Sequence, residues 1–272
     1  MTHFKSPVRY NVGHPGSGNR SQFAGLPVGF EAISKYYTFD PFARLDTDTI
    51  PGAGEEPGNA WTNTAVSVGA GTSAFTVSSN LTPPRLVATT AANENDGIQT
   101  QYTAASGAGD FFDLAAGKLR FFEASFLLHD ANDDADTVEQ CELFLGVCVP
   151  DTTVLGGAAD YIGFHKADGS GAINFVAGKN STSLGDQISE STGITLAAAN
   201  AGTANANLTS LSFVVSGTDT VFIYANGSFV STVSSSTQFP DDVQLTPTMA
   251  FLAGEAVVKN MSIAKFVTSI EI

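Results

Sequence analysis

Oxygen-bearing side chains alternate along residues 130–136, where the sequence reads Asp-Ala-Asn-Asp-Asp-Ala-Asp. Carboxylate and amide oxygens are the ligands that a hard cation such as calcium prefers. The helix-loop-helix calcium pattern is not met, because Ala135 replaces its glycine and Cys141 replaces its final glutamate. A solvated acidic loop explains the cluster equally well, so we expect no cofactor, with calcium as the one candidate. Its ligands would be Asp130, Asn132, Asp134 and Asp136.

Two carboxylates that meet in a cleft would indicate a glycosidase. The nearest pair within one predicted strand is Glu139 and Glu142. A spacing of three sends these side chains to opposite faces of a strand, which removes the arrangement that catalysis needs. Asp241 and Asp242 follow Pro240 and are typical of a turn. The sequence does not favour a glycosidase.

The histidines offer no catalytic or metal-binding arrangement. The chain has four, and no two share a metal-ligand spacing: His3, His14, His129 and His165. Within its predicted strand, we expect His165 to point outward and not to act as a base. Nucleophile elbows, phosphate-binding loops and dinucleotide fingerprints have no counterpart in the sequence. The residues therefore predict a protein that is not an enzyme.

Aromatic side chains are candidates for a sugar-binding platform of the kind a lectin uses. The four considered are Trp61, Tyr102, Tyr161 and Tyr224. The core of an all-β protein also needs aromatic residues, and the chain has 20 Phe and a single Trp. Both interpretations, core and platform, stay open.

Glycine-containing dipeptides break the second half of the chain into strands. Asp168-Gly169, Ser216-Gly217 and Asn226-Gly227 each separate two apolar runs, and such dipeptides supply the positive φ angles of hairpin turns. Spacing of about a dozen residues between strands is typical of a β-sandwich. The strands we predict are Ala74–Val77, Arg85–Ala88, Gly97–Tyr102, Lys118–Leu128, Glu139–Val149, Asp160–Lys166, Ala172–Ala177, Leu208–Val215, Thr220–Ala225, Ser228–Val233, Thr246–Ala253 and Val257–Val267.

The chain divides into residues 1–60, an extended arm with its connection, and residues 61–272, the sandwich. Proline and glycine are frequent in 1–35 and no periodic pattern is sustained there. Residues 36–60 are predicted to be an irregular connection. For residues 184–207 a short helix and a long loop are both open. The long segment 119–129 mixes its apolar phases, which predicts partial burial on both faces of one strand.

Charge is distributed unevenly. The formal net charge is −15, which argues against general nucleic-acid binding. Residues 1–36 nevertheless hold four basic residues and one acid, Glu31, whereas the remainder is strongly acidic. A loose tail and an arm that orders on a partner are both open for residues 1–35. In the second case the contacts would come from Phe4, Arg9, Tyr10, Arg20, Phe23 and Lys35.

Cys141 and Cys148 would lie about 23 Å apart on one extended strand, too far for a disulfide. We expect free thiols, as in a reducing cytoplasm. The first residues lack the apolar segment of a secretion signal, and no apolar run is long enough to span a membrane.

Several short motifs in the body resemble those of tailed-phage virion proteins with a lectin/glucanase-like jelly-roll body. In order they are Asn95–Gln101, Gly117–Phe126, Glu142–Gly146, Asp151–Thr153, Asp160–Gly169, Tyr224–Gly227, Pro240–Asp242 and Leu245–Thr248. The resemblance covers about residues 90–267 and leaves the arm outside.

The resemblance implies an all-β, antiparallel, concanavalin A-like jelly-roll sandwich with no enzymatic activity. It also implies a capsid decoration or cement protein that binds and stabilises the major capsid protein shell. Such a protein would be made in the host cytoplasm and lie on the outer capsid surface, as a dimer or trimer, without contact to nucleic acid or membrane. The alternative is a carbohydrate-binding module of a fibre or host-recognition protein.

Overall fold

A computed structural model describes residues 36–39, 60–66, 71–78, 85–103, 112–130, 138–196 and 208–271. In this part of the chain it contains fifteen β-strands and one short 3-10 helix, η3 (Val154–Gly156). The strands are β1 (Tyr36–Phe39), β2 (Ala60–Val66), β3 (Ala74–Ser78), β4 (Arg85–Thr89), β5 (Gly97–Thr103), β6 (Leu119–Asp130), β7 (Cys141–Cys148), β8 (Tyr161–Lys166), β9 (Ala172–Gly178), β10 (Ile188–Thr195), β11 (Thr209–Ser216), β12 (Thr220–Ala225), β13 (Ser228–Ser234), β14 (Thr246–Ala253) and β15 (Lys259–Glu271). None of the described residues form a helix long and apolar enough to cross a bilayer.

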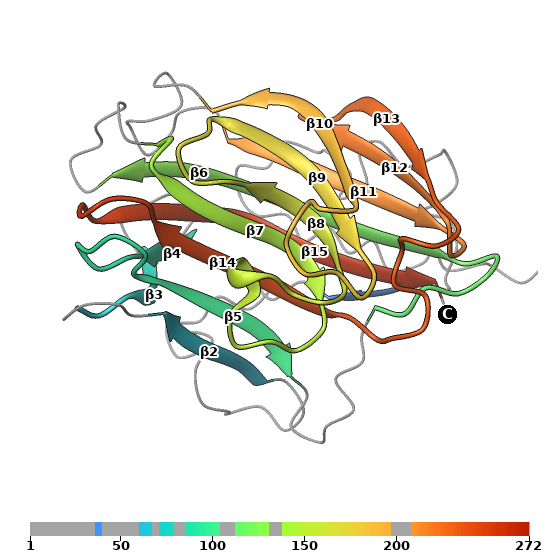
Figure 1. Cartoon of the computed structure of the whole chain (residues 1–272), viewed down its shortest axis with the longest axis horizontal. Helices are drawn as coiled ribbons and strands as arrows, with labels where there is room; N and C mark the ends of the chain where they lie inside the picture. The colour runs from blue at the N-terminus through green and yellow to red at the C-terminus, as the bar shows by residue number, and fades with distance from the viewer. Residues whose placement is uncertain are drawn as a thin grey trace, which may run out of the picture.

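The strands form two antiparallel sheets packed face to face (Figure 1). The eight-stranded sheet has the order β13-β12-β11-β6-β15-β4-β3, with β1 added beside β15. The seven-stranded sheet has the order β10-β9-β8-β7-β14-β5-β2. The chain passes from one sheet to the other between β4, β5, β6 and β7, and again between β13, β14 and β15. The fold is therefore the predicted one, an all-β concanavalin A-like jelly-roll sandwich.

All three predicted hairpin turns are present. The φ angles of Gly169 and Gly217 are 69° and 70°. Between β12 and β13, both Asn226 (φ 49°) and Gly227 (φ 77°) are in the left-handed region, as a two-residue type I′ turn requires. These glycines relieve a conformation that an L-residue with a Cβ adopts at a cost of about 1 kcal/mol.

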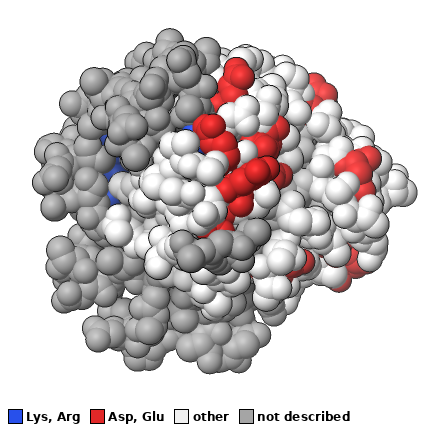
Figure 2. Space-filling view, turned by 60° about the vertical axis from the view of Figure 1, so that its left-hand side comes forward, with Lys and Arg blue, Asp and Glu red and all other residues white. Residues whose placement is uncertain are grey.

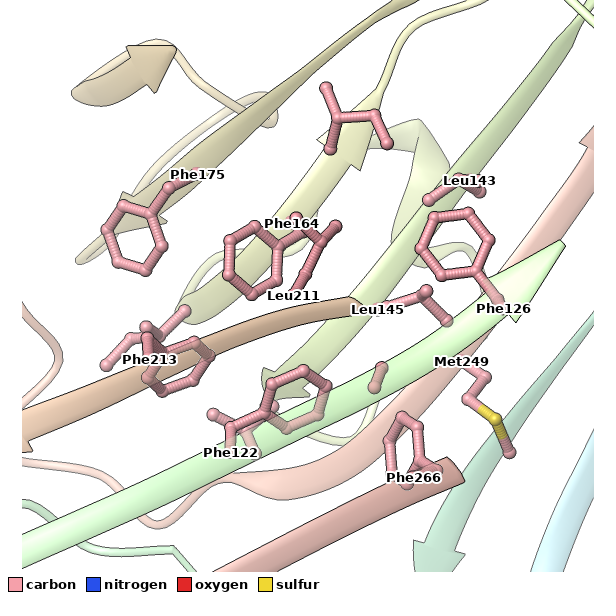
Figure 3. Close-up of a cluster of buried hydrophobic side chains, with 14 of the residues drawn as sticks. Phe122, Phe126, Leu143, Leu145, Phe164, Phe175, Leu211, Phe213, Met249 and Phe266 are labelled. Carbon is pink, nitrogen blue, oxygen red and sulfur yellow. The ribbon is translucent and has the colours of Figure 1, made fainter. Parts of the chain in front are cut away.

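Phenylalanine rings fill the space between the sheets (Figure 3). The Phe213 ring stacks on that of Phe122 with centroids 5.0 Å apart, and it meets Phe164 and Phe175 at 5.9 and 5.7 Å. Each such pair adds about 0.5–1.5 kcal/mol beyond the area it buries. Because these rings come from both sheets, they fix the sheets against one another.

Strand β6 is buried on both faces, as its mixed apolar phase predicted. Phe122 and Phe126 point into the core, whereas Phe121 points to the opposite face and packs with Val214 of β11. β6 lies between β11 and β15, so both of its edges are paired.

All twelve predicted strands are present, and three further strands were not predicted. β10 lies in the stretch 184–207, so neither the helix nor the loop considered there holds for Ile188–Thr195. Ile188 and Thr192 share its buried face, but Gly193 (φ 72°) and a register shift weaken the pattern. β2 opens the body, and β1 occupies four residues of the connection expected to be irregular.

The two cysteines are free and buried, as predicted. Cys141 faces the core between the sheets, whereas Cys148 faces outward from the seven-stranded sheet. Burial raises the pKa of Cys141 to about 11 and that of Cys148 to about 12. At neutral pH both side chains are therefore unreactive thiols.

Candidate functional site

The outward face of the seven-stranded sheet carries Glu142 and His165, two of the residues that the sequence analysis weighed as candidates. Pairing across β9, β8, β7, β14 and β5 sets Asn174, His165, Phe144, Ala250 and Gln99 in one row. One half of this face is covered by the segment 149–160 and the loop 179–187, and the other half carries His165.

Two glutamine side chains of β5 hold the segment 149–160 against the sheet. Gln101 Oε1 accepts the N–H of Asp151 at 2.8 Å, and its Nε2 donates to the carbonyl of Val149 at 3.1 Å. Gln99 Oε1 accepts the N–H of Val154 at 3.0 Å. Both glutamines are buried, so these bonds satisfy side chains and loop backbone that water does not reach.

Tyr161 anchors the second loop. Its hydroxyl donates to the carbonyl of Ser183 and accepts the N–H of Gly185, both at 2.8 Å. The ring is fully buried and lies edge-on to Phe144, with centroids 6.3 Å apart. Burial raises the pKa of Tyr161. A small second core forms outside the sandwich; its buried members are Phe144, Cys148, Val154, Ala158, Tyr161, Val176 and Ala250.

Three of the short motifs quoted above therefore have structural roles. The Asn95–Gln101 motif supplies the two glutamines, Asp151–Thr153 lies in the segment they hold, and Asp160–Gly169 supplies Tyr161. Their residues hold two chain segments against this half of the sheet face.

His165 and Glu142 are joined by a hydrogen bond on the other half of the face, with Nε2 and Oε1 2.8 Å apart. Their side chains are 14% and 24% exposed. His165 points outward, as predicted, while its neighbour Lys166 points inward. An imidazole and a carboxylate at this distance can exchange a proton or bind a polar group from solvent.

Glu142 is the one carboxylate that the strands of this sheet place on the described outward face. The next positions along β7 on the same side are Phe144 and Gly146. Glu139 is exposed and precedes β7, so the two acids do not share a strand as the sequence analysis assumed. A sugar-cleaving pair would need a second carboxyl about 5–10 Å away across this face.

Lys166 occupies the end of the sandwich beside this pair. It is fully buried, and its Nζ donates to the carbonyls of Glu139 (2.7 Å), Cys141 (2.6 Å) and Ala167 (3.3 Å). All three donors of the ammonium group are thus used. Burial lowers the pKa of Lys166. The residue holds the ends of β7 and β8 together and is not accessible to a substrate.

The calcium candidate lies almost wholly outside the described residues. Asp130 is the last residue of β6, and Asn132, Asp134 and Asp136 fall in the undescribed range 131–137. In the described part no group of His, Cys, Asp or Glu side chains is arranged to hold a metal. The six predicted contact residues of the arm, between Phe4 and Lys35, are also outside the described residues.

The four platform aromatics do not form one surface. Tyr102 and Tyr161 are buried, and the side chain of Trp61 is outside the description. Tyr224 is half-buried on the outward face of the eight-stranded sheet, where it meets Phe229 at 5.7 Å. Phe229 is 58% exposed, and sequence reasoning did not single it out. The sequence did place Phe229 beside the turn of a predicted hairpin, and this position could have indicated that its side chain is exposed.

Basic side chains of the described body are buried or held in contacts, and exposed acids dominate its surface. Arg85, Arg120, Lys166 and Lys259 are buried, Lys179 and Lys265 are in ion pairs, and Lys118 is partly buried. Figure 2 shows acidic side chains gathered on one face. The described surface is therefore electronegative.

No protein-family model and no curated protein matches the sequence. Solved structures with a similar fold include a protein of unknown function, SO2946, from Shewanella oneidensis MR-1 (10% identity, TM-score 0.49, covering 87% of this chain and 86% of that one). A Bacteroides ovatus mixed-linkage glucan GH16 protein has 12% identity and a TM-score of 0.47 over 77% of this chain and 94% of its own. Alginate lyase AlgAT5 of polysaccharide lyase family 7 has 8% identity and a TM-score of 0.45 over 73% and 82%. At these identities the likeness concerns the fold and carries no function to this chain.

Proposed function

We propose that this chain is a non-enzymatic structural protein of a tailed-phage virion. In this proposal it decorates the capsid, binding the major capsid protein shell and stabilising it from the outer surface. The observation that carries the proposal is the partition of charge. The described body keeps its basic side chains buried or in contacts, whereas Lys5, Arg9, Arg20 and Lys35 belong to the arm.

This separation of charge between arm and body suits a protein that binds a neighbouring subunit through its arm. An acidic body is repelled by an acidic shell, and a cationic arm is attracted to acidic patches on it. Phe4, Tyr10 and Phe23 would add apolar anchors between the charges. Contacts linked along one arm raise the overall affinity, although each is weak.

The partly covered sheet face supports a role without catalysis. Gln99, Gln101 and Tyr161 hold two chain segments over half of the surface. The other half carries the hydrogen-bonded pair His165–Glu142. A body built in this way provides a rigid support for an arm.

The test is binding of the full-length chain to shells of the encoding phage that lack it, followed by co-sedimentation. Arg9→Glu, Arg20→Glu and Lys35→Glu combined should weaken binding at least tenfold, since each exposed pair contributes about 0.2–1 kcal/mol. Raising the salt concentration should weaken wild-type binding as well. A control with Glu139→Gln and Asp168→Asn changes exposed body acids and should bind normally.

Shell binding that survives the triple charge reversal would contradict the proposed role of the arm. No binding to shells, together with binding of the wild-type chain on a glycan array, would favour the carbohydrate-binding alternative. Cryo-electron microscopy of the particle would then locate the protein on shell, tail or fibre.

A further inference from the structure

Among the described strands, β13 is an edge of the eight-stranded sheet, and most of its residues are exposed or half-buried. Its sequence, Ser-Phe-Val-Ser-Thr-Val-Ser, contains no charged residue and no proline. Proteins usually protect such edges with charges, prolines or bulges, because the unpaired N–H and C=O groups can accept another strand. The pairing of β13 with β12 has one register shift, between Ile223 and Tyr224 near the hairpin turn. From Ser231 to Ser234 the pairing with β12 is regular.

The neighbouring edge of the other sheet is protected. β10 carries Glu190 and an irregular register between Ser191 and Thr195, where Gly193 has a positive φ. The two edges are neighbours, and the pairing of each has one register shift, but only β10 also carries a charged residue and a glycine with a positive φ. The difference identifies β13 as the edge open to pairing.

The hairpin of β12 and β13 also lies in a long stretch of sequence without charged side chains. Residues 220–240 contain no Asp, Glu, Lys or Arg, and the nearest charged residues are Asp219 and Asp241. The chain as a whole carries 27 acidic and 12 basic residues. A second strongly acidic molecule would meet the least electrostatic repulsion if it approached at this uncharged surface.

Apolar side chains lie beside this edge. Phe229 is 58% exposed, and its ring packs edge-on against Tyr224 on the outward face of the sheet. Phe222, two residues before Tyr224 on β12, lies on the same face and is partly buried. An exposed aromatic ring next to an unpaired strand edge is typical of an interface anchor.

We propose that β13 and the aromatic side chains beside it form the interface of a homodimer. Two copies of β13 would pair in antiparallel orientation about a two-fold axis, joining the two eight-stranded sheets into one. A two-fold axis requires a surface that is complementary to itself, and an antiparallel strand edge without charge meets that requirement. Phe229 and Tyr224 of each copy would pack at the ends of the shared strand pair.

Sedimentation velocity of the full-length chain over a concentration series tests the interface. The wild-type chain should be a dimer, and added salt should strengthen it, because the acidic bodies repel each other. Thr232→Glu should weaken self-association at least tenfold, since the symmetry brings two like charges together near the middle of the paired strands. Phe229→Glu should do the same, since it replaces an apolar anchor at each end with a charge. Thr195→Glu puts the same charge on the protected edge β10 and should leave the dimer intact.

A second measurement does not depend on these charged variants. Thr232→Cys introduces an exposed thiol into a chain whose own cysteines are buried. Mild oxidation should give a covalent dimer of this variant, and a control with Ser189→Cys on β10 should give no covalent dimer. A wild-type chain that is monomeric at all concentrations, or a dimer unaffected by both glutamate variants, overturns the proposal. Glycan binding by a monomer that is lost in Phe229→Glu overturns it too and assigns the aromatic surface to sugar.

Discussion

The side chain of Gln101 and the backbone of Asp151, fifty residues apart in sequence, are joined by a hydrogen bond of 2.8 Å from the Asp151 N–H to Gln101 Oε1. The same side chain also donates a hydrogen bond to the carbonyl of Val149. Gln101 thus satisfies backbone groups of this segment that, in a sheet, a neighbouring strand would pair with. Part of the outward face of the sheet is thereby covered by a segment fixed at Val149 and Asp151.

Replacing Gln101 with alanine should lower the free energy of unfolding by about 1–3 kcal/mol. The reason is that buried N–H and C=O groups of the segment 149–151 lose their partner. Chemical denaturation measures the change. Gln140→Ala is the matched control, because that side chain is half-buried and makes no hydrogen bond to the segment 149–151 within the described residues; its effect should stay within about 0.5 kcal/mol. Equal effects of the two substitutions would contradict this account.

Tyr161→Phe removes one hydroxyl from the second core and should cost about 1–2 kcal/mol. The loop 179–187 should also become more sensitive to limited proteolysis, since the hydroxyl bonds Ser183 and Gly185. Tyr224→Phe makes the same chemical change on the half-buried outward face of the other sheet and should have little effect on either measurement. Unchanged cleavage in Tyr161→Phe would show that the ring alone holds the loop.

Lys166→Met keeps most of the side-chain volume and removes the ammonium group. We expect a loss of about 1–3 kcal/mol, because one buried carbonyl, that of Cys141, and two partly buried carbonyls lose a charged donor. Lys179→Met removes an exposed ion pair with Asp241 and should cost less than about 1 kcal/mol. Thermal and chemical denaturation would measure both. Similar losses in the two variants would argue against the buried role of Lys166.

The thiols predict a dependence on alkaline pH. Because the native pKa values, about 11 and about 12, exceed the ordinary value of 9.0, unfolded thiols lose their protons first. Each thiol thus contributes stability below about pH 9 that is lost as the pH rises toward its native pKa. The unfolding free energy of the wild type, in reducing buffer, should fall more between pH 7.5 and 10 than that of Cys148→Ala. A thiol reagent should modify neither cysteine in the native protein at pH 8 and both in denaturant.

Much of the fold could be predicted because its signals are local. The turn Asn226-Gly227 and the alternation along β11 and β12 depend on neighbouring residues, and both were found. β10 was missed, because a positive φ at Gly193 and several serines hide its alternation. The pairing of Gln101 with Asp151 and that of Phe229 with Tyr224 depend on tertiary distance or register, so composition and spacing could not reveal them.

Strand β15 follows every other described strand in sequence, yet it lies in the middle of the eight-stranded sheet between β6 and β4. During synthesis β6 must therefore wait for more than a hundred residues before its second neighbour emerges from the ribosome. Until then an apolar strand edge stays exposed, and such intermediates favour aggregation. The eight-stranded sheet is thus completed late, and chaperone binding before β15 emerges should improve the yield of native protein.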